Sequence, residues 1–231
     1  MAPFDALNLG DHVGDALLDV DANRAILQQA IGAQPVFLSQ VHGVHVEWLS
    51  DKTPNGTQAD ACMTDQPHVA CTIMVADCLP VLLTNEQGSL IAAAHAGWRS
   101  LAGQGGYGIL EQVLERFNAL DPGNSAQAAT KIIAWLGPCI GPHAFEVGND
   151  VRDAFVSQNR AAQTLFLPTS SGKWLADLQG LARLRLAAAG VTQIYGNDGS
   201  SAWCTVSQPS RFFSYRRDRV TGRMAACIWR D

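Results

Sequence analysis

Charged side chains are scarce in this sequence. Asp, Glu, Lys and Arg make up 16% of the 231 residues, while hydrophobic residues make up 47%; an average soluble domain carries about 25% charged residues. Because so few charged side chains are available to cover a large solvent-exposed surface, we expect extensive burial or a subunit interface such as that of a homodimer. The net charge of −5, with scattered basic residues, argues against a protein that binds nucleic acid.

Long apolar segments are also absent. No run approaches the roughly 20 residues of a membrane-spanning helix, and Met1–Asp5 has neither the basic start nor the apolar centre of a secretory signal. We therefore predict a cytoplasmic protein that does not interact with membranes. Its six cysteines, at positions 62, 71, 78, 139, 204 and 227, should then be reduced and form no disulfide.

Three short apolar runs follow one another in the first half of the chain. They cover Val69–Ala76, Val81–Thr84 and Ser89–Ala94, and turn-forming residues or Pro80 bound them. Runs this short and this apolar are typical of buried strands rather than helices. The turn formers at 85–88 predict that the second and third runs form a β-hairpin.

The remaining pattern alternates helices and strands. Helices are predicted at residues 20–32 (with Asp21 as its cap and Ile26 and Leu27 on its inner face), 107–120, 150–159 and 175–189. Short strands are predicted at 35–38, 44–48, 132–136, 191–195 and 224–229. Residues 121–130 read as a polar connector. Because no repeat or linker divides the sequence, we expect a single domain over residues 1–231.

Three residues with metal-binding side chains stand at strand ends: His42, Cys78 and His95. Zinc takes imidazole and thiolate ligands, and a catalytic zinc keeps three protein ligands and one open position. The spacing of 36 and then 17 residues matches no local metal motif, so the three residues could also be unrelated. Cys78 and His95 could instead form the nucleophile–base pair of a cysteine hydrolase. His45 lies three residues after His42 and should point elsewhere.

Several short segments together resemble one known family. They are Gln40–Gly43, Ala59–Ala61, Ala76–Val81, His95–Arg99, Gly137–Pro142, Phe145–Val147 and Phe212–Asp218, and the match runs from about Pro3 to Trp229. On these segments the chain is similar to the YfiH/laccase-domain family. The resemblance implies an α/β (α+β) fold in which mixed β-sheets pack face to face and helices flank them. It also implies that His42, Cys78 and His95 bind Zn²⁺.

The resemblance implies an activity as well. The family is associated with phosphorolysis of purine nucleosides and deamination of adenosine. We therefore expect a zinc-dependent purine nucleoside phosphorylase that takes phosphate and adenosine, inosine or methylthioadenosine, with adenosine deaminase activity. Arg99 is expected to hold phosphate with its planar guanidinium, and Asp77 to orient a histidine ligand. Further candidates are Glu146 as a catalytic residue and Gln40, Cys139, Arg216 and Arg217 as substrate contacts.

Two alternative functions remain open at this point. One is a metal- or cysteine-dependent amidohydrolase that edits cell-wall precursors. The other, and the least favoured, is the copper polyphenol oxidase (laccase) chemistry that the family was long named for. A blue-copper site plus a three-copper cluster needs many histidines, whereas this sequence has six, at positions 12, 42, 45, 68, 95 and 143, and no His-x-His pair. Copper bound here is therefore not expected to be functional.

One part of the family pattern lies outside this sequence. Members usually carry a Thr-Arg-x-Gly-Gly stretch upstream of the segment that resembles residues 3–10, and this sequence begins after that point. We therefore expect that one strand of the family fold and one arginine facing the substrate are absent, which would reduce activity.

Overall fold

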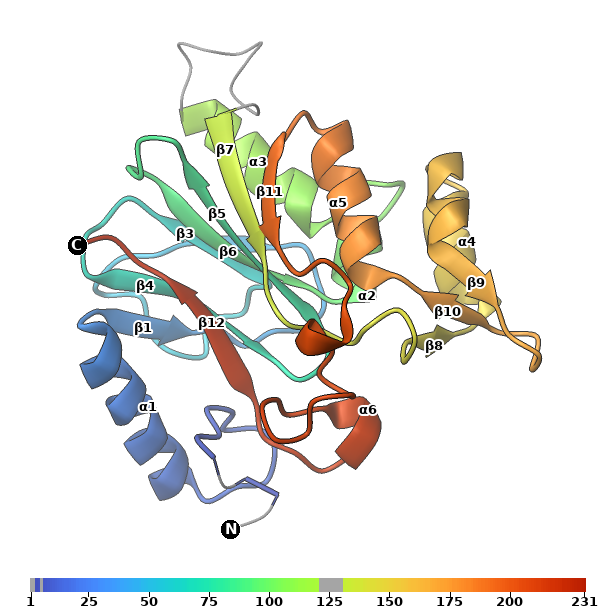
Figure 1. Cartoon of the computed structure of the whole chain (residues 1–231). Coiled ribbons are helices and arrows are strands. Elements are labelled where there is room, and N and C mark those ends of the chain that lie inside the picture. The colour runs from blue at the N-terminus through green and yellow to red at the C-terminus, as the bar shows by residue number, and fades with distance from the viewer. Residues whose placement is uncertain (1–2, 5, 121–130) are drawn as a thin grey trace.

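The computed structural model describes residues 3–4, 6–120 and 131–231 (Figure 1). Its α-helices are α1 (Leu17–Ile31), α2 (Trp98–Ala102), α3 (Ile109–Leu120), α4 (Asn149–Val156), α5 (Leu178–Ala188) and α6 (Tyr215–Asp218). Its strands are β1 (Gln34–Phe37), β2 (Val46–Trp48), β3 (Ala61–Thr64), β4 (Val69–Val75), β5 (Leu79–Asn85), β6 (Ile91–Ala96), β7 (Ile132–Leu136), β8 (Glu146–Val147), β9 (Phe166–Pro168), β10 (Trp174–Ala176), β11 (Gln193–Gly196) and β12 (Met224–Ile228). The connector predicted at 121–130 falls outside the described residues.

Two larger sheets and one small sheet organise the described residues. The six-stranded mixed sheet has the order β11-β7-β5-β6-β3-β2, and a second sheet has the order β1-β4-β12. A small antiparallel sheet joins β8, β10 and β9. Helices α3 and α5 cover one face of the six-stranded sheet, while α1 runs beside β1 on the outer side of the second sheet (Figure 1). The predicted class, mixed sheets packed face to face with flanking helices, is confirmed.

The cores explain the sequence pattern. Side chains such as Ile73 of β4 and Cys62 of β3 meet between the two larger sheets, so that β4 and β6 are buried at every position. A strand covered on both faces reads as a continuous apolar run rather than an alternating one. On the other face, α3 buries the apolar stripe predicted for it, from Ile109 through Val113 to Phe117, against β6 and α5.

The three central runs divide between the two sheets. The second and third form the predicted hairpin, in which β5 pairs antiparallel with β6. The first run, β4, instead lies between β1 and β12 in the other sheet. The chain therefore crosses from one sheet to the other at Asp77 and Cys78, and Asp77 takes a left-handed backbone with φ of +94° there. This crossing places Cys78 at the seam between the sheets.

Two helix predictions need correction at their N-terminal ends. Helix α1 begins at Leu17 rather than at residue 20, so Asp21 lies inside the helix, and Ile26 is 55% exposed while Leu27 packs inward. The helix predicted from residue 175 begins at Leu178, because Trp174–Ala176 forms β10. Asp177 follows the last residue of that strand, and its side chain caps the helix by accepting a hydrogen bond from the Gly180 N–H at 2.6 Å.

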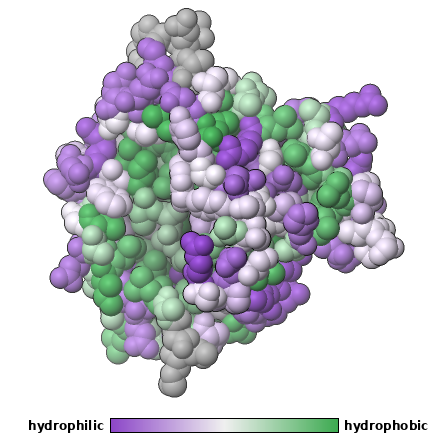
Figure 2. Space-filling model, in the orientation of Figure 1, coloured by the Kyte–Doolittle hydropathy of each residue, from purple (hydrophilic) through white to green (hydrophobic). Residues whose placement is uncertain are grey.

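The surface reflects the shortage of charge. Hydrophobic side chains gather beside β12 on the face shown in Figure 2, where a groove of about 330 Å³ is lined mainly by apolar residues of β5, β7 and β12, including Leu82, Trp135 and Met224. The six cysteines are free thiols. Among the described residues, no helix combines the length and the hydrophobicity that crossing a membrane requires.

Candidate metal centre

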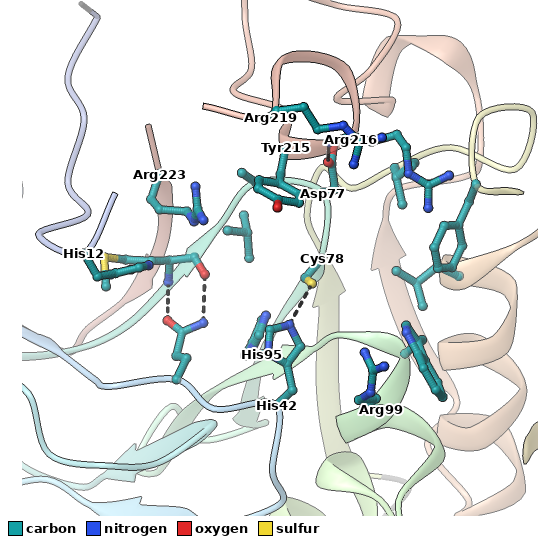
Figure 3. A pocket seen from close by; sticks show the side chains of 18 residues that line it. His12, His42, Asp77, Cys78, His95, Arg99, Tyr215, Arg216, Arg219 and Arg223 are labelled. Carbon is teal, nitrogen blue, oxygen red and sulfur yellow. Dashed lines mark hydrogen bonds between the residues drawn. The ribbon is translucent and has the colours of Figure 1, made fainter. Parts of the chain in front are cut away.

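The structure brings together the three predicted ligands (Figure 3). His42 lies in the loop between β1 and β2, Cys78 in the crossing between β4 and β5, and His95 near the end of β6. Their ligand atoms all lie within 4.8 Å of one another, and the Cys78 Sγ lies 3.6 Å from the His42 Nε2. The two imidazole rings meet edge to face with centroids 4.7 Å apart. A single ion can therefore be shared by all three side chains.

A buried carboxylate organises two of these ligands. Asp60, which precedes β3 and is fully buried, accepts a hydrogen bond from the His95 Nδ1 at 2.8 Å. It also accepts from the backbone N–H groups of Val41, His42 and Gly43 at 3.2, 2.9 and 2.6 Å. These bonds hold His42 in a left-handed conformation with φ of +59°, which is unfavourable for a non-glycine residue. Asp60 thus positions one ligand through its ring and another through its backbone.

The sequence interpretation assigned no role to Asp60, although the residue stands in the Ala59–Ala61 segment. Its signal is a carboxylate between two alanines at the start of an apolar strand, where an acidic side chain is rarely buried without a partner. Only the folded chain reveals that the partner is a metal-ligand candidate.

Gly97, directly after β6, leaves the space that the site occupies. A Cβ at this position would lie 2.8 Å from the His42 Cδ2 and 3.1 Å from the Cys78 Sγ. The first distance is shorter than real Cβ contacts and the second is tighter than most of them, so a larger residue here would press on two candidate ligands. The backbone φ of −63° is open to any residue, which means that close packing and not backbone conformation requires glycine.

Replacing Gly97 by alanine should therefore weaken metal binding at least about 10-fold, a loss comparable to removing a group that orients a ligand. The fold should survive, because α2 can begin at an alanine. Competition with a chromophoric chelator measures the affinity, and thermal unfolding of the chelator-treated protein checks the fold. Wild-type affinity in a folded Gly97→Ala protein would contradict the packing argument.

The charges around the site shift the pKa values of Cys78 and His95 in opposite directions. Burial raises the pKa of the Cys78 thiol, but the neighbouring His95 and His42 outweigh it and lower this pKa to about 6. Burial lowers the pKa of His95, but the Cys78 thiolate and Asp60 outweigh it and raise this pKa to about 9. The two opposite pKa shifts favour a thiolate and an imidazolium over the neutral pair in the metal-free protein. Since Asp60 occupies Nδ1, an incoming ion would replace the proton on the Nε2 of His95.

This donor set fits a borderline-soft metal ion. Two imidazoles and one thiolate suit zinc or copper, whereas magnesium and calcium prefer oxygen ligands. Because there are three protein ligands, a tetrahedral ion would keep one position for water or substrate.

A cavity of about 590 Å³ opens above the three ligands. Arg99 and Arg216 line one side, where their guanidinium groups lie over the rings of Trp98 and Phe145 at 4.3 and 5.6 Å. Figure 3 shows Arg223 and His12 on the opposite side of Cys78, with Tyr215 and Arg219 above it. The other lining residues are Gln40, Met74, Val75, Ala76, Asp77, Ile140 and Leu178. The cavity therefore joins an aromatic and apolar wall to a cluster of positive charges.

Comparison with known proteins assigns the chain to a family. The family model described as multi-copper polyphenol oxidoreductase laccase matches residues 1–231. The chain belongs to this family. Escherichia coli YfiH, named as a purine nucleoside phosphorylase, is 46% identical over 231 residues, with 99% of this chain and 88% of that protein covered. A purine nucleoside phosphorylase of Pseudomonas aeruginosa is 45% identical over 229 residues, with 99% and 87% covered. The crystal structure of a Neisseria meningitidis protein matches with a TM-score of 0.87 at 43% identity, covering 100% of this chain and 89% of that one.

Four further residues singled out from the sequence line the cavity of this laccase-family chain: Gln40, Asp77, Arg99 and Arg216. Gln40 is already engaged, because its amide exchanges two hydrogen bonds of 2.8 Å with the backbone of Met74. It therefore shapes the wall and holds β4 in place. The guanidinium groups of Arg99 and Arg216 lie on the aromatic side of the cavity, and the Nη1 of Arg216 donates to the Glu146 carbonyl at 3.1 Å.

Asp77 has a different role from the one predicted. Its carboxylate accepts hydrogen bonds from the Thr205 hydroxyl and from the backbone N–H of Arg216, both at 2.6 Å. Its carbonyl accepts from the Ile140 N–H at 2.9 Å. Asp60, and not Asp77, binds a histidine ligand. Asp77 instead ties the crossing that carries Cys78 to the C-terminal part of the chain, beside α6.

Three other predicted residues lie away from the cavity. Glu146 is partly exposed, and its carboxylate pairs with Lys173 at 2.9 Å. Cys139 is fully buried, and its thiol lies 3.6 Å from the Gln179 side-chain oxygen. Arg217 donates to the Thr205 carbonyl at 2.7 Å and pairs with its neighbour Asp218. Each of these side chains therefore contacts other parts of the protein rather than the cavity.

The cavity also contains residues that the sequence interpretation passed over: His12, Tyr215, Arg219 and Arg223. The three C-terminal ones stand in the run Tyr215–Arg223, which contains four arginines within nine residues. Such a cluster of positive charges in a sequence with few charged residues is the feature that could have pointed to these residues. Which of the arginines face the cavity depends on the turn after α6, where Arg219 takes a φ of +63°.

Proposed function

We propose that this protein is a zinc-dependent purine nucleoside phosphorylase that acts on adenosine, inosine and methylthioadenosine. The observation that carries the proposal is the 590 Å³ cavity, which combines a His-Cys-His metal set, an aromatic wall and four arginines. The names printed for the E. coli and P. aeruginosa relatives support the same activity. A purine stacks on aromatic rings, and a phosphate dianion binds guanidinium groups.

The reaction is a displacement at C1′ of the ribose. A phosphate oxygen forms a bond to C1′ while the bond from C1′ to N9 of the purine breaks, and its electron pair leaves with the purine. The proton of the hydrogenphosphate ion ends on the departing base, so that ribose 1-phosphate and the free purine are the products. Arginine from this set would bind and orient phosphate, and Trp98 and Phe145 would hold the base and exclude water from the ribose.

Zinc would be held by His42, Cys78 and His95. When bound, the ion supplies a Lewis acid that polarises a substrate oxygen and stabilises developing negative charge. The protein's part is to keep the ligands in place: Asp60 holds the proton on Nδ1 of His95 and fixes the ring. The same centre would support deamination of adenosine, in which water adds at C6 and ammonia leaves.

A product assay on metal-analysed protein tests the proposal. Adenosine and inosine, each with and without phosphate, should yield free base and ribose 1-phosphate in equal amounts only when phosphate is present. Ammonia released from adenosine without phosphate would establish the deaminase activity. Base release that does not depend on phosphate, or no release by zinc-loaded protein, would refute the phosphorylase assignment.

One observation favours a second candidate, an amidohydrolase with Cys78 as its nucleophile. Asp60, His95 and Cys78 lie in the order of an orienting carboxylate, a base and a thiol. The presence of His42 at 3.6 Å from the thiol favours the metal assignment instead, because a nucleophile does not need a second imidazole. Hydrolysis of an amide by metal-free protein would select the hydrolase.

A further inference from the structure

Arg223, directly before β12, is held rigidly at the edge of the cavity. Its Nη1 donates to the carbonyls of Thr221 and Gly222, each at 3.1 Å. Its stem packs against Gly10, where a Cβ would lie only 2.8 Å from the Arg223 Cγ. Its own backbone N–H is bound by the side chain of Asn8 at 2.8 Å. A side chain fixed at both ends in this way is preorganised for a ligand.

The guanidinium of Arg223 is half-buried and has no carboxylate partner among the described residues. Arg24 and Arg185 each pair with a carboxylate, of Asp11 and Glu111 respectively, whereas Arg223 resembles Arg183 and Arg216 in donating to backbone carbonyls. Burial lowers the pKa of Arg223 by more than the nearby Cys78 and Asp77 raise it. Withdrawing a cation from water is costly unless an anion compensates it, and the open space beside this cation is the cavity.

The other charged groups near Arg223 do not serve as a direct anionic partner for its guanidinium. The Asp77 carboxylate is occupied by the Thr205 hydroxyl and a backbone N–H. Cys78 belongs to the metal set. Neither group forms an ion pair with Arg223 in the structure, so an anion that binds its guanidinium directly would come from a bound molecule.

The position of Arg223 suits one reactant in particular. Arg99 and Arg216 lie with the aromatic wall on one side of Cys78, and Arg223 lies with His12 on the other (Figure 3). In a displacement at C1′ the nucleophile and the leaving base stand on opposite faces of the sugar. A purine on the aromatic side thus leaves the Arg223 side for the nucleophile.

We propose that Arg223 forms the subsite for the attacking phosphate, opposite a purine subsite at Trp98 and Phe145. This assignment rests on the proposed phosphorylase function. It assigns Arg99 and Arg216 to the nucleoside rather than to the free phosphate.

The test compares Arg223→Gln with wild type in the zinc-loaded protein. The KM for phosphate should rise about 10- to 100-fold, the range expected for losing hydrogen bonds to a charged group, while the KM for inosine stays within about twofold. Calorimetric titration with inorganic phosphate alone, without nucleoside, should show the same loss. Arg211→Gln is the matched control, because Arg211 is exposed, lies outside this cavity, and among the described residues donates to the Ala202 carbonyl and lies over the Phe212 ring.

The outcomes separate the subsite from the function. Phosphorolysis with an unchanged phosphate KM in Arg223→Gln would overturn the subsite and leave the phosphorylase standing. Phosphate binding that requires Arg223 in a protein without phosphorolysis would support the subsite and refute the phosphorylase. Titration with adenosine 5′-monophosphate distinguishes the source of the phosphate: Arg223-dependent binding of the nucleotide but not of inorganic phosphate would overturn the assignment to the free ion.

Discussion

Replacing Cys78 by alanine should abolish zinc binding and turnover together while barely changing the stability of the fold. Only two imidazoles would remain, and losing a direct ligand should cost more than the about 10- to 100-fold in affinity that follows the loss of a group behind a ligand. Cys78 is half-buried in the crossing between the sheets, so we expect a change in unfolding free energy within about 1 kcal/mol. Metal analysis, kcat/KM for phosphorolysis and denaturant unfolding with chelator measure the three effects.

His45→Ala is the matched control for the histidine ligands. His45 is exposed and contacts the Glu47 carboxylate at 3.2 Å, although it lies only three residues from His42. The control should keep full metal content and activity. Stoichiometric zinc in a Cys78→Ala protein without activity would move Cys78 from ligand to nucleophile. Retention of both zinc and phosphorolysis would remove Cys78 from the site altogether.

Asp60→Asn should damage both the metal affinity and the stability of the protein. Zinc affinity should fall about 10- to 100-fold, since Asp60 orients His95. Because an amide NH₂ would replace one oxygen that now accepts backbone N–H groups, the chelator-treated protein should lose about 1–3 kcal/mol of unfolding free energy. Chelator competition and denaturant unfolding measure the two effects separately.

Asp77→Asn is the control for this experiment, because Asp77 is the neighbouring buried carboxylate that does not contact a histidine. Its partners are the Thr205 hydroxyl and the Arg216 N–H. The variant should lose stability while zinc affinity stays within about threefold of wild type. Equal losses of zinc affinity in the two variants would show that Asp60 has no special part in the centre.

Much of the fold could be predicted from local patterns. The buried strands β4 to β6 read as apolar runs because both of their faces are covered, and α3 shows its buried stripe directly. The division of β4 and β5 between two sheets could not be predicted, because sheet pairing joins residues far apart in sequence. Nor could the start of α1 at Leu17, where Ala16 provides no side-chain cap.

The site divides in a similar way. The candidate ligands His42, Cys78 and His95 could be predicted from the sequence as metal-binding side chains at strand ends, supported by the family resemblance. The groups that position them are not visible, because the bond from Asp60 to His95 joins two strands that pair only in the folded sheet. The arginine-rich run Tyr215–Arg223 is plain in the sequence, but the position of the Arg223 side chain depends on Gly10 near the other end of the chain.

The crossing at Asp77 has a kinetic consequence. Its hydrogen bonds reach partners 128 and 139 positions later in the chain, and such distant contacts are slow to form because long loops must close first. The metal centre is therefore complete only in a nearly native molecule. An ion that binds the native state but not the folding transition state lengthens the lifetime of the folded protein without accelerating its formation. Zinc in this position would bind as the last step of folding and would have to leave as the first step of unfolding.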